Sequence, residues 1–411
     1  MKPRLLASVL SFCLAGLFLA FPSAQGQPGN GPILKGQSRG DLIPGRFIVV
    51  LKAGASSSAV VARHGLAPDV VYSAALNGFA GAFPAARVEK LLRDSQVEFI
   101  EEDQVVTIGA QTLPAGINRI DAELNATVIA ARTAGTGVNV DIAIIDTGID
   151  LTHPDLNVVK DVSFVKGTRT GNDDNGHGTH CAGIAAARDN TAGVVGVAPG
   201  ARLWAVKVLD RNGSGTMSNV IKGVDYVTSN ASSIEAANMS LGGGNSDALN
   251  LAISNSVAKG VVYAVAAGNS AVDAASSSPA NSPVVLCVSA MVDTDGIPGG
   301  SGPSTSYGQD DTFASFSNYG AVVDIAAPGV NVYSTYKGGA YATMSGTSMA
   351  SPHVTGAVAL YLATHGKPTN ATGVAAVRQA IINAALPQGG TSGFTGDPDA
   401  TKEPLLYAKN L

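Results

Sequence analysis

Apolar runs that alternate with helix-like segments dominate the chain from about residue 111 onward. Runs that are apolar on both faces are typical of parallel strands covered by helices on either side. The alternating segments are Val138–Ile145, Gly178–Ala187, Ala201–Leu209, Ser218–Ser229, Ala236–Leu241, Leu249–Lys259, Val261–Ala266, Val284–Ala290 and Ser348–His365. The sequence therefore predicts an α/β domain with a mainly parallel central sheet flanked by helices, and functional residues at the carboxyl ends of its strands.

Residues 44–108 have a different pattern, which predicts a small α+β unit before this domain. In chain order it reads as strand, helix, strand, helix and strand, over Arg46–Leu51, Ala55–His64, Ala75–Phe83, Ala85–Asp94 and Val97–Ile108. A Gly-, Pro- and Gln-rich stretch at 27–43 is typical of a loose linker. We expect this unit to be ferredoxin-like.

The N-terminus has the layout of a secretory signal peptide. Lys2 and Arg4 precede an apolar run, Leu5–Phe21, and small residues follow around Ala24 and Gly26. We expect residues 1–26 to be removed and the mature protein to be secreted and extracellular. The alternative is a membrane anchor, but the run is short for a span and no later stretch is long enough to cross a bilayer.

Composition excludes several classes of protein. Hydrophobic residues make up 45% of the 411 residues and charged residues 14%, which is a globular composition rather than a disordered one. The net charge of −5 gives no basis for binding nucleic acid through a basic surface. Cys181 and Cys287 would remain after signal removal, and we interpret both as buried small hydrophobic residues, with one disulfide bridge as the alternative.

Three polar residues stand at the ends of apolar segments. Asp146 ends a buried strand, His177 lies in a glycine turn that enters a helix, and Ser348 begins an apolar helix. A serine hydroxyl needs an adjacent base to act as a nucleophile, and a histidine of near-neutral pKa can take its proton. A buried carboxylate would fix the tautomer of the imidazole. We therefore expect Asp146, His177 and Ser348 to form a catalytic triad.

The segments around these residues resemble the active-site blocks of the subtilases. They read Asp141-Ile-Ala-Ile-Ile-Asp-Thr-Gly148, Asn175-Gly-His-Gly-Thr-His180 and Ser345-Gly-Thr-Ser-Met-Ala-Ser-Pro-His353. A fourth, Ala266-Ala-Gly-Asn269, resembles the block that supplies the oxyanion-hole amide, so Asn269 is expected to act with the Ser348 N–H. Cys181 fits the proteinase K branch, although the usual disulfide cysteines of that branch are missing.

The resemblance also implies how peptides are bound and how the enzyme is controlled. Two segments, Gly213-Ser214-Gly215 and Ser240-Leu241-Gly242, should lie on either side of a protein or peptide substrate and bind its backbone as an added strand. Their alternative role is that of simple turns. Residues 27–110 are similar to the subtilase propeptide, an intramolecular inhibitor, which leaves 111–411 as the peptidase domain. We expect this secreted serine endopeptidase to process itself and to be a monomer.

A structural calcium ion is a further implication of the resemblance. The ligands would be the backbone carbonyls of Pro283 and Val285 and the carboxylate of Asp324, and the alternative is that Asp324 caps a turn. The segment from Asp293 to Asp311 carries four carboxylates, at Asp293, Asp295, Asp310 and Asp311. We interpret it as a solvated loop, with a second metal ion as the alternative.

Three other functions are weighed against the peptidase. An esterase of the α/β-hydrolase type would need Gly-x-Ser-x-Gly and the order Ser, Asp, His, whereas Ala350 replaces the second glycine and the order here is Asp, His, Ser. A zinc enzyme could use His177 and His180, but no acidic third ligand follows closely. An inactive secreted binding protein is disfavoured because all four catalytic positions are filled.

Overall fold

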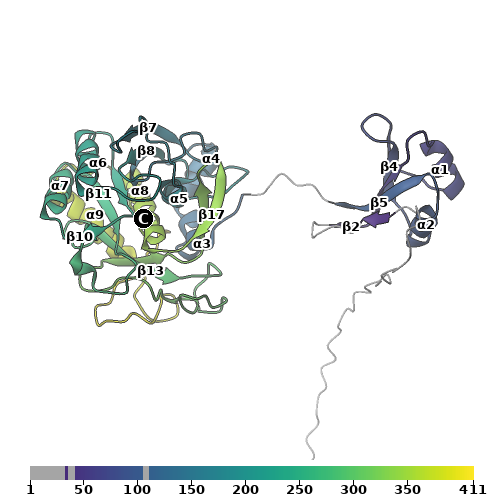
Figure 1. Ribbon diagram of the computed structural model, residues 1–411. Coiled ribbons are helices and arrows are strands. Elements are labelled where there is room, and N and C mark those ends of the chain that lie inside the picture. The colour runs from purple at the N-terminus through teal and green to yellow at the C-terminus, as the bar shows by residue number, and fades with distance from the viewer. Residues whose placement is uncertain (1–32, 36–41, 105–110) are drawn as a thin grey trace, which may run out of the picture. The chain divides into compact units, whose positions relative to one another are not determined.

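The computed structural model describes residues 33–35, 42–104 and 111–411. The chain divides into two compact units, residues 1–107 and 108–411 (Figure 1). The predicted signal peptide, residues 1–26, lies outside the described residues, as does the end of the predicted strand at 105–108.

The N-terminal unit is a small sheet with two helices. Its elements are β1 (Ile33–Lys35), β2 (Leu42–Leu51), α1 (Ser57–His64), β3 (Val70–Tyr72), β4 (Gly78–Ala82), α2 (Ala85–Leu91) and β5 (Val97–Gln104). Strands pair antiparallel in the order β5-β2-β4-β3, and β1 adds in parallel to β5. From β2 to β5 this is the β-α-β-β-α-β arrangement of a ferredoxin-like fold, which confirms the predicted α+β unit.

Apolar side chains from the strands and both helices hold this unit together. Val49, Phe79, Leu91 and Ile100 are fully buried in its core. The sequence analysis missed β3 because its valines, Val70 and Val71, are 44% and 57% exposed and show no alternation with polar residues.

The C-terminal unit is built on a mainly parallel sheet, eight-stranded in the described part of the chain. Its strand order is β14-β13-β11-β9-β6-β8-β7, with β15 also paired to β13. The paired strands are parallel except β14. Its strands are β6 (Asp141–Asp146), β7 (Val158–Ser163), β8 (Arg202–Lys207), β9 (Ala236–Met239), β11 (Val262–Ala266), β13 (Leu286–Val292), β14 (Thr312–Phe313) and β15 (Ile325–Pro328). The predicted fold class is confirmed.

Helices cover this sheet, and two short strand pairs form separate small sheets. The helices are α3 (Ala115–Arg119), α4 (Ala126–Ala134), α5 (His177–Ala186), α6 (Met217–Ser229), α7 (Asp247–Val257), α8 (Thr347–His365) and α9 (Ala371–Ala384), with 3-10 turns at Ala122–Leu124 and Ala274–Ser276. Two further pairs are β10 (Gly243–Gly244) with β12 (Ser277–Ser278), and β16 (Val332–Tyr336) with β17 (Ala340–Met344). Figure 1 shows α8 in the middle of the unit and α6 and α7 side by side.

Burial explains which of these elements the sequence predicts. All six residues of β6 are buried, and α8 packs against α5, β9, β11, β13 and β15, so neither element has a polar face exposed to solvent along most of its length. The edge strand β7 escaped prediction because Lys160 and Asp161 are exposed in its centre. No helix within the described ranges is long and apolar enough to cross a membrane.

Candidate active site

Asp146 and His177 meet at the carboxyl end of strand β6. Asp146 is the last residue of that strand and is fully buried. His177 is the first residue of α5, and its Nδ1 lies 2.8 Å from Oδ1 of Asp146. Because a carboxylate accepts hydrogen bonds, Nδ1 is the protonated nitrogen of a neutral His177, and Nε2 is left as the base.

The turn that leads into α5 is held by a second carboxylate, Asp173. Its Oδ1 accepts hydrogen bonds from the backbone N–H groups of Asn175 and Gly176, both at 2.9 Å. Its Oδ2 accepts from the backbone N–H and the hydroxyl of Thr179, at 3.0 and 2.6 Å. Gly176 adopts a φ of 117°, a backbone conformation open mainly to glycine. Asp173, to which the sequence analysis gave no role, therefore fixes where His177 enters the helix.

The Asp146 carboxylate stabilises the protonated form of His177. Burial opposes a charged imidazole, but the charge of Asp146 and its hydrogen bond outweigh that effect, so the pKa of His177 is raised above its ordinary value. The second oxygen of Asp146, Oδ2, is buried and has no hydrogen-bond partner among the described residues. The pair is thus arranged to accept a proton at Nε2 and to hold the resulting imidazolium.

Ser348 stands at the start of the buried helix α8. Gly346 precedes the helix with a φ of 155°, and Ser348 is its second residue. The N–H groups of the first helical turn have no partner within a helix, so the backbone N–H of Ser348 is available to a ligand. The positive end of the helix dipole favours negative charge at the same place.

The backbone carbonyl of Ser348 is anchored from outside its own helix. Pro352 lies four residues on and has no N–H, so the usual helical donor to this carbonyl is absent. Instead the carbonyl accepts hydrogen bonds from the hydroxyl of Ser240, at 2.8 Å, and from the thiol of Cys181, at 3.3 Å. The hydroxyl of Ser348 in turn donates to the carbonyl of Ser240, at 3.2 Å.

Asn269, beyond the carboxyl end of β11, is oriented by the residue before Ser348. Its Oδ1 accepts hydrogen bonds from the backbone N–H and the hydroxyl of Thr347, at 2.8 and 2.9 Å. This fixes the plane of the amide, and the Nδ2 donor is what Asn269 can offer to a ligand. Asn269 and Ser348 line the same cavity.

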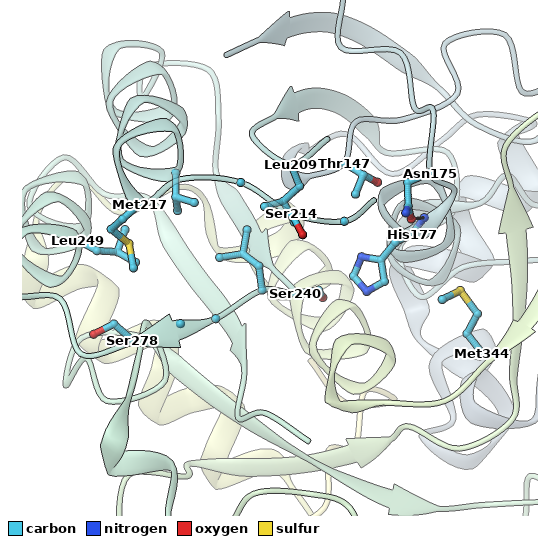
Figure 2. A pocket seen from close by; sticks show the side chains of 16 residues that line it. Thr147, Asn175, His177, Leu209, Ser214, Met217, Ser240, Leu249, Ser278 and Met344 are labelled. Atoms are coloured by element: carbon cyan, nitrogen blue, oxygen red, sulfur yellow. Dashed lines mark hydrogen bonds between the residues drawn. The ribbon is translucent and has the colours of Figure 1, made fainter. Parts of the chain in front are cut away.

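Two cavities adjoin at this edge of the sheet. All of Ser240-Leu-Gly242 lines the first, and Leu241 and Gly242 also line the second. The first has a volume of about 550 Å³ and is lined by His177, Gly213–Gly215, Ser240–Gly243 and the side chains of Met217 and Leu249. Figure 2 shows the imidazole of His177 pointing into it, with Met217 and Leu249 farther along. The second, of about 340 Å³, is lined by Leu241–Gly244, Ala266–Ser270, Ser277, Ser278, Ala280, Asn318, Thr347 and Ser348, none of which is charged.

A comparison with known protein families matches residues 137–402 to the subtilase family. The chain belongs to the subtilase family. Residues 67–109 match the peptidase inhibitor I9 family, within the N-terminal unit and the segment that follows it. By its family the chain is therefore a subtilisin-like serine endopeptidase with an inhibitor-type propeptide.

Subtilases from bacteria and fungi are among its relatives. An alkaline protease of Alkalihalobacillus alcalophilus is 45% identical over 275 residues, 66% of this chain and 66% of the relative. Subtilisin E of Bacillus subtilis (strain 168) is 41% identical over 302 residues, 72% of this chain and 73% of the relative. An alkaline serine protease of Corniculantispora psalliotae is 38% identical over 365 residues, 86% of this chain and 89% of the relative.

A solved structure extends the likeness to three dimensions. The crystal structure of a cold adapted subtilisin-like serine proteinase matches with a TM-score of 0.57 and 35% sequence identity, covering 72% of this chain and 97% of that one. The likeness excludes the α/β-hydrolase esterase considered above, because a subtilase has its own fold and its own order of catalytic residues.

His177 and His180, the two candidate zinc ligands, contact different partners, and His177 faces Asp146. Nε2 of His180 lies 3.1 Å from the carbonyl of Val332 and 3.0 Å from that of Ala342, so His180 is bonded to the β16–β17 pair. Ligand atoms of Asp146, His177 and Cys181 do lie within 4.8 Å of one another. Burial, however, raises the pKa of the Cys181 thiol well above its ordinary value, and the protonated thiol donates to Ser348. Both free cysteines, Cys181 and Cys287, are buried and unbridged.

The expected calcium ligands are already in contact with a cation of the chain. Arg378 in α9 donates from Nη1 to the carbonyl of Pro283 at 2.7 Å and from Nη2 to Oδ1 of Asp324 at 3.2 Å. Oδ2 of Asp324 also accepts from the backbone N–H of Cys287, at 2.9 Å. With a guanidinium in place against the Pro283 carbonyl and the Asp324 carboxylate, these two of the three expected ligands do not fit a calcium ion.

Two buried polar residues behind the site were missed by the sequence analysis. Asn238 in β9 donates to the Ser240 hydroxyl at 2.9 Å, and its Oδ1 accepts from Ser351 and Thr355 of α8, at 2.9 and 3.1 Å. Lys207, fully buried at the end of β8, donates to the carbonyl of Thr147 at 2.6 Å. For Asn238 the available signal was a polar residue inside a strand that is otherwise apolar.

Proposed function

We propose that Asp146, His177 and Ser348 are the catalytic triad of this subtilase, with Asn269 and the backbone N–H of Ser348 as its oxyanion hole. The observation that carries the proposal is the 2.8 Å contact between His177 Nδ1 and Asp146 Oδ1, with His177 lining the first cavity and Ser348 the second, which adjoins it. The sequence alone leads to the same four residues.

The reaction follows from these positions. The Ser348 hydroxyl turns from the Ser240 carbonyl to Nε2 of His177, gives up its proton there, and attacks the carbonyl carbon of the scissile peptide bond. The oxyanion that forms accepts hydrogen bonds from Asn269 Nδ2 and Ser348 N–H. His177 then protonates the departing amine as the C–N bond breaks, and a water molecule, deprotonated by His177, releases the acyl group from Ser348.

The substrate is a protein or peptide held as an extended strand. Gly213-Ser214-Gly215 and Ser240-Leu241-Gly242 both line the cavity into which His177 points, which supports their role in binding the peptide backbone. The second cavity, beside Ser348 and Asn269, receives the side chain that precedes the cleaved bond. Because its lining is uncharged, it favours large apolar side chains over Lys and Arg.

The precursor has three parts in this proposal. Residues 1–26 are a signal peptide, 27–110 an inhibitory propeptide and 111–411 the peptidase domain, which is exported to the extracellular space and acts as a monomer. The match of 67–109 to an inhibitor family and the division of the chain into two compact units support this division of roles. Assignment to the proteinase K branch rests on Cys181 and on the fungal relative.

Replacement of the nucleophile tests the proposal. We expect Ser348→Ala to reduce peptide hydrolysis to near the uncatalysed rate and to leave residues 27–110 attached when the precursor is made in a protease-deficient host. Ser345→Ala, three residues earlier in the same segment, is the matched control and should mature normally. Full activity of Ser348→Ala would overturn the triad, and normal maturation of that variant would overturn self-processing.

A further inference from the structure

The loop between β13 and β14 brings four carboxylates together, and only one of them has a cationic partner. Oδ1 of Asp311 accepts from Arg119 Nε at 2.9 Å, and its Oδ2 accepts from the N–H groups of Gly299 and Gly300. Asp293, Asp295 and Asp310 form no ion pair with any described Lys, Arg or His within 4.0 Å. The loop therefore brings three carboxylates together without a direct ion pair among the described residues, and Arg119, which is paired with Asp311, acts on Asp293 only through its charge.

The oxygens of these three side chains converge. One carboxylate oxygen from each of Asp293, Asp295 and Asp310 lies within 4.8 Å of the other two. Asp293 and Asp310 are each only 4% exposed, and Asp295 is the more accessible member. Like charges at this separation repel one another strongly in a buried site, so a counter-charge must be supplied from outside the chain or a proton must be bound.

Asp293 gives a second, independent indication of a ligand. Its Oδ1 accepts a hydrogen bond from the N–H of Gly296 at 3.0 Å, but its Oδ2 is buried and has no partner among the described residues. A buried carboxylate oxygen without a partner is costly, and it is the kind of atom that a bound cation satisfies.

The surrounding backbone holds the cluster in place before any ion binds. Oδ1 of Asp310 accepts from the N–H and the hydroxyl of Thr294, at 2.8 and 2.9 Å, and its Oδ2 accepts from Gly302 N–H at 2.9 Å. Asn118 in α3 donates to the carbonyl of Gly296 at 2.9 Å. The loop is thus tied to itself and to a neighbouring helix, which lowers the conformational cost of binding.

We propose that Asp293, Asp295 and Asp310 bind one divalent cation, and that calcium is the ion their chemistry selects. Carboxylate oxygens are hard ligands, which suit calcium or magnesium rather than zinc or copper. Calcium accepts six to eight oxygens in a flexible geometry, so carbonyls and water can complete its shell, whereas magnesium demands a strict octahedron. This site is separate from the Pro283, Val285 and Asp324 set, and it does not depend on the peptidase mechanism.

The ion would also support the segment that carries Asn269. From Asp310 the chain runs through β14 to Phe316 and Asn318. The carbonyl of Phe316 accepts from Ala271 N–H at 3.0 Å, and Asn318 N–H donates to the carbonyl of Gly268 at 2.8 Å. These bonds lie on either side of Asn269. Removal of the ion is therefore expected to loosen the cleft as well as the loop.

Calcium binding by the full-length Ser348→Ala chain tests the site without self-digestion. After treatment with a chelator, equilibrium dialysis against calcium gives the number of ions bound per chain, and thermal melting with calcium or chelator gives the stabilisation. We expect Asp293→Asn to bind one calcium ion fewer than its parent and to lose the rise in Tm that calcium gives the parent. Asp225→Asn, an exposed acid of α6, is the matched control and should keep both.

A second variant covers the case in which Asp293→Asn does not fold. Asp295→Asn changes the most accessible ligand, and we expect it to weaken calcium binding by at least tenfold with an unchanged circular dichroism spectrum. Equal calcium stoichiometry in the parent and in Asp293→Asn would overturn the proposal. So would a parent that binds no calcium while Asp293→Asn is as stable as the parent, because Asp293 would then simply carry a proton.

Discussion

Ser240 and Ser348 are joined by a reciprocal pair of hydrogen bonds. The Ser240 hydroxyl donates to the Ser348 carbonyl at 2.8 Å, and the Ser348 hydroxyl donates to the Ser240 carbonyl at 3.2 Å, across 108 residues of sequence. The first bond anchors the nucleophile's backbone where Pro352 supplies no helical donor. The second occupies the nucleophile's hydroxyl until it turns to His177.

Loss of the Ser240 hydroxyl is therefore expected to slow catalysis without abolishing it. Ser240→Ala removes one donor to the Ser348 carbonyl, while Cys181 retains the other. A hydrogen bond of this kind is worth about 1 kcal/mol, so we expect kcat to fall about 2- to 10-fold with little change in KM. Steady-state kinetics on a peptide substrate provide the measurement, with Ser229→Ala at the exposed end of α6 as the control. An unchanged kcat would show that the anchor is dispensable.

The amide of Asn269 can be tested apart from its structural bonds. Asn269→Asp keeps an oxygen for the two bonds from Thr347 but removes the N–H donor that faces the cavity. We expect kcat to fall by about 10²–10³, the range known for an oxyanion-hole donor of subtilisin, with KM nearly constant. A thermal melt checks that the variant is folded. A higher KM with an unchanged kcat would mean that Asn269 binds the substrate rather than the oxyanion.

The pH dependence of activity should report the Asp146–His177 pair. Because the pKa of His177 is raised, its base form predominates only at higher pH, and kcat/KM should rise with an apparent pKa above about 6.5. In Asp146→Asn burial still lowers the pKa of His177 and the charge of Asp146 is gone, so this pKa should fall below that of the parent even though the charge of Asp173 still raises it. NMR titration of His177 in the Ser348→Ala chain, with and without Asp146→Asn, measures both values. A pKa unchanged by Asp146→Asn would contradict the pairing.

The uncharged second cavity predicts cleavage after large apolar residues. A matched series of peptides that differ only before the cleaved bond should show Phe, Tyr or Leu well above Lys and Arg in kcat/KM. Ser277→Asp places a carboxylate in the cavity lining and should raise cleavage after Lys and Arg relative to Phe. Preferred cleavage after Arg by the unaltered enzyme would be incompatible with this cavity as the primary pocket.

Arg378 should make the Asp324 site independent of calcium. Burial raises the pKa of the Asp324 carboxyl, and the Arg378 charge counteracts it. In a Ser348→Ala, Asp293→Asn chain, which lacks the loop site, we expect added calcium to leave Tm unchanged. Adding Arg378→Ala should lower Tm by several degrees, and calcium should then restore part of the loss. Arg378→Lys, which keeps the charge, is the control. Calcium stabilisation before Arg378 is changed would show that the guanidinium does not replace the ion.

The sequence was sufficient to predict the central strands of the sheet and the candidate catalytic residues, because local patterns reveal both. β6 is buried on both faces, and Asp146 is the polar residue that ends it. The contacts that tune the site are not local. Asp324 and Arg378 are 54 residues apart, and Arg378 looks like an ordinary polar residue of an amphipathic helix until the fold brings it to Pro283. Edge strand β7 and the exposed β3 lack the burial that makes strands recognisable.

The place of Ser348 on α8 determines when a newly made chain can first cleave other proteins. Synthesis delivers the N-terminal unit first, then the segments that carry Asp146 and His177, and Ser348 only after most of the sheet strands. α8 packs against five of those strands, and β15 is paired through Ala326 with Leu405, near the end of the chain. The cleft thus receives its nucleophile after the N-terminal unit has had time to fold, since domains fold largely in order of synthesis. A chain whose synthesis stops before Ser348 contains His177 and Asp146 but lacks the nucleophile.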